Sequence, residues 1–229
     1  MRWLLLVCVL WAAPAQACRL ALVLGLDVSS SVDAREYQIQ TQGLATALNS
    51  PKVRDEIFAF PDAPVALYAF EWSGRFDQVT LVPWTLLRSP ADLQKVITQL
   101  RLAERSFSNR PTALGHALGH ALRAFNQGPS CQKRTVDISG DGYNNDGIAP
   151  TRLYEMTPLG DITVNGLPIG DGEIANYYHR RIIQGPGAFV EWARGFEDFE
   201  RAMRAKLERE LRPATLSALS PNQAKRQPH

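Results

Sequence analysis

The amino-acid sequence predicts an α/β fold: a doubly wound, mostly parallel six-stranded sheet with one antiparallel edge strand and helices on both faces. Two observations lead to this expectation. Apolar runs of strand length alternate along the chain with segments in which apolar residues recur at helical spacing. The first apolar run, residues 19–27 (RLALVLGLD), is nearly continuous, which is typical of a strand buried on both faces of a parallel sheet.

The strands are predicted from such apolar runs and from the turn residues between them. The third strand is expected to run antiparallel to the second, because the turn at Ser73 and Gly74 is too short for a crossover connection. We expect the six strands at residues 19–27, 65–72, 77–84, 134–139, 162–169 and 187–192.

The helices are predicted where a capping residue precedes apolar residues that lie three and four apart. Asp33, with Glu36 three residues later, forms a capping-box pattern, and Ser89 followed by Pro90 is a second typical start. We expect helices at about residues 34–50, 90–100, 112–125 and 196–211.

Both ends of the chain are expected to lie outside the folded domain, which is predicted to span residues 18–212. Residues 1–17 combine a basic start, an apolar run and an Ala-Gln-Ala cleavage site, which is typical of a signal peptide. The apolar run of 11 residues is too short for a transmembrane helix, which needs ~20. Residues 213–229 are expected to form a disordered polar tail. The protein is therefore predicted to be exported, to the periplasm or to the medium.

The composition and the distribution of charges argue against two classes of partner. The chain has 229 residues, 45% of them hydrophobic and 21% charged, with a net charge of +2, which is ordinary for a globular domain. Like charges do not cluster along the sequence, so we expect neither nucleic acid nor a membrane surface as a partner.

Two cysteines, Cys18 and Cys131, remain once the signal peptide is removed. Each directly precedes a predicted strand, the first and the fourth, and those strands are neighbours if the sheet has the order 3-2-1-4-5-6. In an oxidising compartment, the two cysteines are therefore expected to form a structural disulfide at the amino ends of the strands.

Three polar segments are expected at the opposite edge, where doubly wound sheets bind ligands. They are Asp27-x-Ser29-x-Ser31 after the first strand, Thr112 at a helix start, and Asp141 after the fourth strand. Hydroxyl and carboxylate oxygens without His or Cys suit Mg²⁺, Mn²⁺ or Ca²⁺ rather than Zn²⁺. The sequence therefore predicts a divalent-cation site, with Mg²⁺ as the favoured ion.

These five positions resemble the metal-ion-dependent adhesion site of the von Willebrand factor type A (VWA) domain, whose pattern is D-x-S-x-S, a distant Thr and a distant Asp. The resemblance covers essentially all of residues 18–212 and implies a Rossmann-like VWA fold. It implies that Ser29 and Ser31, with Thr112 as a third candidate, bind the ion directly, whereas Asp27 and Asp141 act largely through water. It also implies that an Asp or Glu side chain of another protein completes the coordination of the ion.

A narrower resemblance, in segments 71–74, 137–145 and 185–190, is to an uncharacterised family of exported bacterial VWA proteins. Polar and aromatic residues in the first two segments follow strands that end at the metal edge. We expect them to form a partner-binding rim made of Glu71, Trp72, Ser73, Tyr143 and Asn144, while the alternative that Trp72 packs in the core and Glu71 caps a turn stays open.

The preferred function is protein binding through a divalent cation, without catalysis. Two alternatives stay open, a metal-dependent hydrolase that uses the same oxygen cluster and a structural subunit stabilised by its metal. The sequence places no His or Lys as a general base beside the cluster. His116 and His120 have the spacing of a zinc-protease pair, but Ala117 stands where that motif has Glu, so a solvated or hydrogen-bonded pair is expected.

Overall fold

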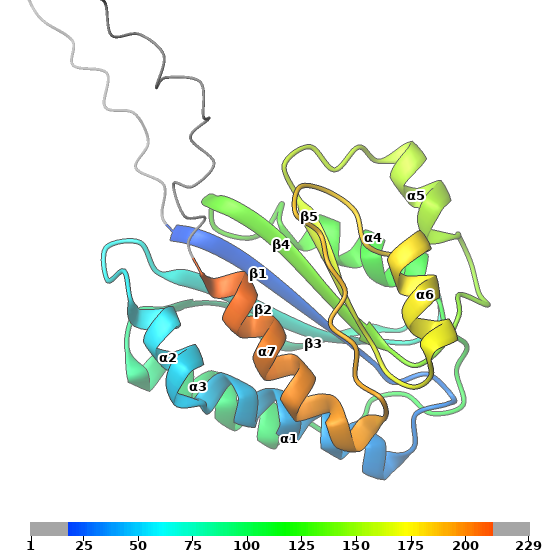
Figure 1. Ribbon diagram of the computed structural model, residues 1–229, viewed down its shortest axis with the longest axis horizontal. Helices are drawn as coiled ribbons and strands as arrows, with labels where there is room; N and C mark the ends of the chain where they lie inside the picture. Colours follow the sequence, from blue (N-terminus) through cyan, green and yellow to red (C-terminus); the bar gives the residue numbers. More distant parts are fainter. Residues whose placement is uncertain (1–17, 213–229) are drawn as a thin grey trace, which may run out of the picture.

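The computed structural model describes residues 18–212, in which a five-stranded sheet has helices on both faces (Figure 1). The strands lie in the order β3-β2-β1-β4-β5, and β3 alone is antiparallel to its neighbour. The predicted α/β fold is confirmed, with five strands in place of six. Their bounds are β1 (Cys18–Asp27), β2 (Val65–Trp72), β3 (Gln78–Leu87), β4 (Cys131–Gly140) and β5 (Thr163–Pro168).

Alternate side chains of the strands divide the core into two layers. The even-numbered leucines of β1, from Leu20 to Leu26, pack against one layer of helices, and Val23 packs against the other. The first layer consists of α1 (Ala34–Asn49), α2 (Pro51–Phe58), α3 (Pro90–Arg101) and α7 (Phe199–Leu211), and the second of α4 (Leu114–Ala124), α5 (Pro150–Met156) and α6 (Gly172–Arg181) (Figure 1). Because helices cover both faces of the sheet, the central strands reach solvent only near their ends and through the loops there.

Three helices, α2, α5 and α6, are absent from the sequence prediction. Each buries few side chains: α2 buries Val53 and Ile57, and α6 buries Ile174 and Tyr178. A helix with only one or two buried apolar positions shows too little periodicity to be recognised. The start of α6 does carry a signal, because Asp171 caps its first turn.

The predicted strand at residues 187–192 is wrong. This segment runs along the outer edge of β5, but it makes only isolated bridges there, through Val190 and Ala193. One reason is that the backbone N–H of Phe189 donates to the side-chain oxygen of Asn165, 3.0 Å away, and not to a strand carbonyl. The edge of the sheet is therefore covered by irregular chain, which protects it from pairing with another molecule.

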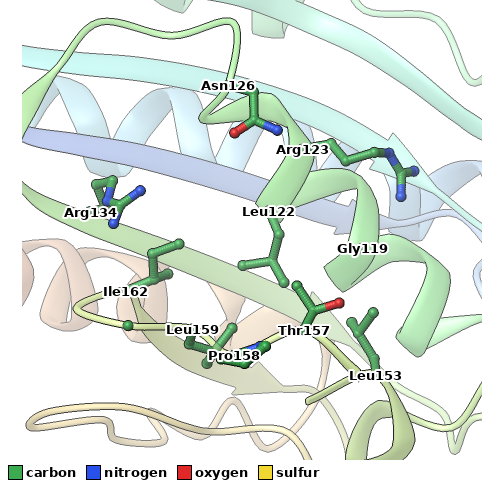
Figure 2. A pocket seen from close by; sticks show the side chains of 11 residues that line it. Gly119, Leu122, Arg123, Asn126, Arg134, Leu153, Thr157, Pro158, Leu159 and Ile162 are labelled. Carbon is green, nitrogen blue, oxygen red and sulfur yellow. The ribbon is translucent and has the colours of Figure 1, made fainter. Parts of the chain in front are cut away.

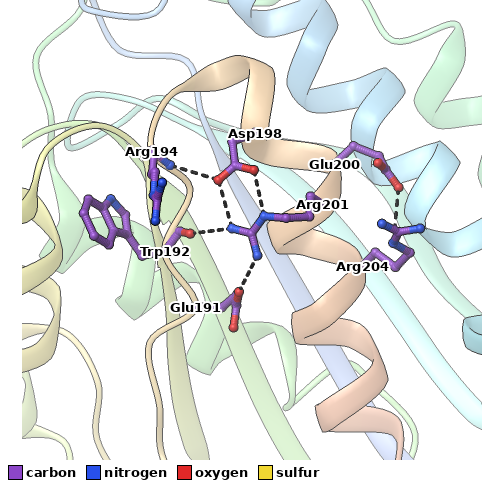
Figure 3. Close-up of polar contacts among 7 residues, drawn as sticks. All are labelled: Glu191, Trp192, Arg194, Asp198, Glu200, Arg201 and Arg204. Atoms are coloured by element: carbon purple, nitrogen blue, oxygen red, sulfur yellow. Dashed lines mark hydrogen bonds and ion pairs between the residues drawn. The ribbon is translucent and has the colours of Figure 1, made fainter.

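Arg201 of α7 fastens this edge segment to the helix layer (Figure 3). Its guanidinium binds Asp198 through two nitrogens, at 2.7 and 2.9 Å, and also contacts the carboxylate of Glu191 at 3.0 Å. A further bond reaches the backbone carbonyl of Trp192 at 2.8 Å. A forked guanidinium can hold several acceptors at once, which suits it to fixing a segment that pairs with β5 only at isolated bridges.

Cys18 and Cys131 form a disulfide, with Cα atoms 4.6 Å apart. They are opposite each other in the register of the parallel strands β1 and β4, as predicted. The bond lies at the amino ends of the strands, away from the predicted metal edge. The predicted signal peptide (1–17) and tail (213–229) lie outside the described residues, and no described helix is long and apolar enough to cross a membrane.

Candidate metal centre

Two carboxylates meet at the carboxyl edge of the sheet. Asp27 is the last residue of β1, and Asp141 follows the last residue of β4. The two strands are parallel neighbours that end at the same edge (Figure 1). The topology therefore brings together two residues that are more than one hundred positions apart in sequence.

A chain of hydrogen bonds joins four of the five predicted ligands. The Oδ1 atom of Asp27 accepts from the backbone N–H of Ser29 at 2.7 Å. The hydroxyls of Ser29 and Ser31 lie 3.2 Å apart, and the Ser31 hydroxyl donates to Asp141 Oδ1 at 2.6 Å. Asp27 and Ser29 are fully buried, whereas Ser31 is exposed. The cluster is therefore buried on one side and open to solvent on the other.

Thr112 approaches the cluster through the loop that follows β4. Its backbone N–H donates to the side chain of Asn145 at 2.8 Å, and its carbonyl accepts from the backbone of Asn145 at 2.9 Å. A Cβ added to Gly142 would lie 3.4 Å from the Thr112 hydroxyl oxygen. The structure thus places Thr112 against the loop of Asp141, while no hydrogen bond within residues 18–212 joins it directly to the other four ligands.

Electrostatics at this edge favour a cation. Burial and, next in size, the charge of Asp141 raise the pKa of Asp27 to about 7, and burial also raises the pKa of Asp141. Within the described chain, neither carboxylate has an ion pair, and Asp27 Oδ2 is buried without a hydrogen-bond partner. Arg105 is close, yet it donates to the carbonyls of Val28 and Ser29, at 3.0 Å each, and not to a carboxylate. A bound cation would offset the repulsion between the two acids.

The donor set fits a hard divalent cation. It offers carboxylate and hydroxyl oxygens, the ligands that Mg²⁺ and Ca²⁺ prefer. Among the described residues there is no group of three or more His, Cys, Asp and Glu that could hold a metal, and the hydroxyls of Ser29 and Ser31 are the further oxygens that this edge offers. Asp27 Oδ2, which lacks a partner, is an available acceptor for the ion or for its water.

His120, the second histidine of the pair on α4, has a structural role. The Nε2 atom of His120 lies 3.0 Å from the Tyr68 hydroxyl, and its ring packs on Phe70 with centroids 4.6 Å apart. Burial lowers the pKa of His120, which keeps the ring neutral in this setting. The expectation of a hydrogen-bonded histidine is confirmed for this residue.

Three of the predicted rim residues are in the wrong place for a partner, because Glu71, Trp72 and Ser73 have no exposed surface. The carboxylate of Glu71 accepts from the backbone N–H of Ser106 at 2.8 Å, and the Ser73 hydroxyl donates to the carbonyl of Pro111 at 3.0 Å. The physical reason is that the connection from α3 to α4 crosses over the end of β2. These side chains hold that connection in place and cannot touch a partner.

The remaining rim residues lie on the loop after β4. Tyr143 is 49% exposed and packs edge-on against Tyr177 at 4.9 Å. Asn144 is half-buried, and its side-chain oxygen accepts from the backbone N–H of Gly115 at 3.1 Å, so it mainly shapes the loop. Phe76, which sequence analysis did not single out, is 86% exposed in the turn between β2 and β3. Its neighbour Arg75 pairs with Asp146 of the loop after β4, which joins this turn to the site.

Five clefts of the described surface lie away from the oxygen cluster. Figure 2 shows one of about 530 Å³ between α4, α5 and the connection into β5, with Leu122 and Leu153 among its apolar lining. None of the five ligands lines this cleft or the four others found on the described surface. The site is therefore an open surface feature rather than an enclosed small-molecule pocket.

Comparison with solved structures shows the fold. The chain is 16% identical to proximal thread matrix protein 1 from the mussel byssus, solved with a zinc-occupied metal-ion-dependent adhesion site, with a TM-score of 0.60 over 85% of this chain and 46% of that one. It is 17% identical to a von Willebrand factor type A protein from Catenulispora acidiphila, with a TM-score of 0.59 over 85% of this chain and 43% of that one. BatB from Bacteroides thetaiotaomicron is 16% identical, with a TM-score of 0.55 over 83% of this chain and 99% of that one.

The chain thus spans less than half the length of the first two structures. Among curated proteins no sequence matches. A family model described as "Protein of unknown function (DUF1194)" matches residues 17–215. The chain therefore belongs to the DUF1194 family, and its fold is that of a von Willebrand factor type A domain.

Proposed function

We propose that this protein binds a divalent cation at the carboxyl edge of its sheet and, through that cation, captures an acidic side chain of another protein. The observation that carries the proposal is a pair of neighbouring carboxylates that lacks a neutralising side chain among the described residues and adjoins the exposed residue Ser31. The residues that would hold the ion are Asp27, Ser29, Ser31, Thr112 and Asp141. Mg²⁺ is the ion that we propose first, with Mn²⁺ and Ca²⁺ as substitutes.

Each side of the site has a distinct task in this scheme. The buried side, with Asp27 and Ser29, fixes the ion against the sheet. The exposed side, at Ser31, leaves room for a ligand from outside. When bound, the ion supplies the positive charge that attracts a carboxylate, and Tyr143 and Phe76 offer apolar surface nearby. An open site with exposed aromatic neighbours suits a protein partner more than a small molecule.

The same proposal includes export of the protein. A disulfide between Cys18 and Cys131 supports an oxidising compartment, because such bonds are rare in the cytosol. The likeness to a mussel protein with zinc in the same type of site supports a divalent cation in general.

Capture experiments with residues 18–229 test the proposal. The protein is first titrated with Mg²⁺ and Mn²⁺ in a calorimeter and then used as bait against envelope and medium fractions of the source organism. We expect capture with Mg²⁺, loss of capture with chelator, and loss in Asp27→Ala. The matched control is Asp62→Ala, which removes an exposed carboxylate before the amino end of β2. This variant should behave like wild type. Capture that persists in both chelator and Asp27→Ala would refute the metal-dependent mode.

A further inference from the structure

The hydroxyl of Tyr178 and the Oδ2 atom of Asp27 point to the same place in the core. Tyr178 lies on α6, is fully buried, and its hydroxyl has no hydrogen-bond partner within the described residues. Asp27 Oδ2 is buried and without a partner in the same way. A Cβ added to Gly140 would lie 2.7 Å from the tyrosine hydroxyl and 2.6 Å from Asp27 Oδ2. Two polar atoms that lack partners therefore flank one small volume beside Gly140.

Packing alone does not explain a tyrosine at this position. Phenylalanine would fill the same apolar space, whereas a buried hydroxyl without a partner costs about 1–3 kcal/mol. A tyrosine hydroxyl is a hydrogen-bond donor, and a carboxylate oxygen without a partner is the acceptor that suits it.

Gly140 keeps this volume open. The residue ends β4 directly before Asp141, and it is not among the glycines with left-handed backbone. Its requirement for glycine is therefore one of space, since a methyl group there would contact both polar atoms. The glycine allows the carboxylate and the hydroxyl to approach each other.

We propose that Tyr178 is a positioning residue of the metal centre, whose hydroxyl donates to Asp27 Oδ2 through one water that occupies the volume beside Gly140. The inference rests on the proposed function. With Oδ1 held by the backbone of Ser29 and Oδ2 held by Tyr178, the carboxylate has one orientation toward the ion. Such partners orient metal-binding carboxylates, and their loss typically weakens metal binding 10- to 100-fold.

The neighbouring residue ties the same helix to the other side of the site. The Tyr177 hydroxyl accepts from the backbone N–H of Asn144 at 3.2 Å, in the loop that follows Asp141. Two successive tyrosines thus connect α6 to both carboxylate-bearing segments. Binding of an ion should therefore slow hydrogen exchange of α6 as well as of the ligand loops.

The test is Tyr178→Phe, which removes one oxygen and keeps the ring. Mn²⁺ affinity is measured by calorimetry, with circular dichroism to confirm the fold. We expect Mn²⁺ binding to weaken about 10- to 100-fold. Tyr154→Phe is the matched control, because the Tyr154 hydroxyl donates to the carbonyl of Ile182 at 2.5 Å, just beyond the far end of α6. It should lose stability but keep wild-type affinity for Mn²⁺.

Hydrogen exchange of wild type, with and without Mn²⁺, is the second arm and needs no substitution. We expect Mn²⁺ to protect residues 172–181, and this protection to shrink in Tyr178→Phe. If wild type binds Mn²⁺ but Tyr178→Phe binds it equally well, or α6 shows no protection, the positioning role is wrong while the metal centre stands. If wild type binds no divalent cation, the proposed function fails and this inference fails with it.

Discussion

Strand β4 carries two acidic clusters that differ in where their positive charge comes from. Asp141 follows the strand and belongs to the solvent-facing metal edge. Asp137, four residues earlier, points into the core against α7, where the Lys206 ammonium lies 3.1 Å from its carboxylate and 2.6 Å from that of Glu210. All three side chains of this inner cluster are almost completely buried.

The inner cluster, Asp137 with Glu210, is structural, whereas the edge cluster, Asp27 with Asp141, is suited to a ligand. Each cluster has two carboxylates, but only the inner one has a cation supplied by the chain. One ammonium neutralises one of the two acids, and burial together with Glu210 raises the pKa of Asp137 to about 7. At the edge cluster, the described chain supplies no ion pair to either acid. A cation from solvent would supply the missing charge there, which is why we propose the ion for that cluster.

Removal of the internal cation should have the largest effect. Lys206→Met keeps the length of the side chain but leaves Asp137 and Glu210 buried without it. Breaking a buried ion pair by removal of one partner costs about 3–5 kcal/mol, so we expect a loss of that order in the free energy of unfolding in urea.

The control for this substitution is a more exposed ion pair to the same helix, α7. Lys52 pairs with Glu208 of α7, but its side chain is 56% exposed. Lys52→Met should cost less than about 1 kcal/mol, because exposed ion pairs contribute little. Equal losses for the two variants would mean that the inner cluster is not the buried ion-pair network that the comparison requires.

Addition of a cation should stabilise the edge cluster by a smaller amount. At a concentration one hundred times its dissociation constant, a ligand of the folded state adds about 2.7 kcal/mol. We expect Mg²⁺ or Mn²⁺ to raise the unfolding free energy of wild type by this order, and Asp27→Asn to lose most of the increase. In chelator, Asp27→Asn should be as stable as wild type or more so, because one of two repelling acids is gone.

Asp33→Asn serves as the matched control for the cation experiment. Asp33 caps α1 six residues after Asp27, and Asn is an equally good capping residue. The variant should keep the full response to the cation. An Asp27→Asn protein that still gains the full 2.7 kcal/mol or so would contradict the assignment of the ion to this edge.

The two clusters also show which residues could be placed from the sequence and which could not. The ligands of the edge cluster follow strand ends in a recognisable spacing, and parallel topology dictates that such ends meet, so Asp27, Ser29, Ser31 and Asp141 could be placed together in advance. The disulfide was predictable for the same reason, since Cys18 and Cys131 begin neighbouring strands. Local pattern and topology act together at these positions.

The inner cluster and the positioning tyrosine could not be predicted in this way. Lys206 appears in the sequence as one more charged residue between the apolar positions of a surface helix, and only the packing of α7 on β4 shows that it is buried. Tyr178 lies on a helix whose apolar stripe is too short to recognise. Trp72 is absent from the surface because it packs in the core layer with Leu114 and Leu118 of α4. Contacts between distant segments decide all three.

The pH dependence of stability sharpens the comparison by testing one carboxylate of the inner cluster alone. The folded pKa of Asp137 is raised to about 7 from its ordinary value of 3.8, so between these pH values the folded chain binds more protons than the unfolded chain. Stability from this group is therefore fully present below about pH 4 and is lost as the pH rises toward 7, with a slope of at most about 1.4 kcal/mol per pH unit.

Measured in chelator, the unfolding free energy of wild type should fall more steeply from pH 5 to pH 7 than that of Asp137→Asn, whose neutral amide does not titrate. The difference between the two proteins isolates Asp137, because both retain Asp27 and Asp141 in the same surroundings. The opposite sign, with wild type gaining stability relative to Asp137→Asn as the pH rises, would mean that Lys206 keeps Asp137 ionised.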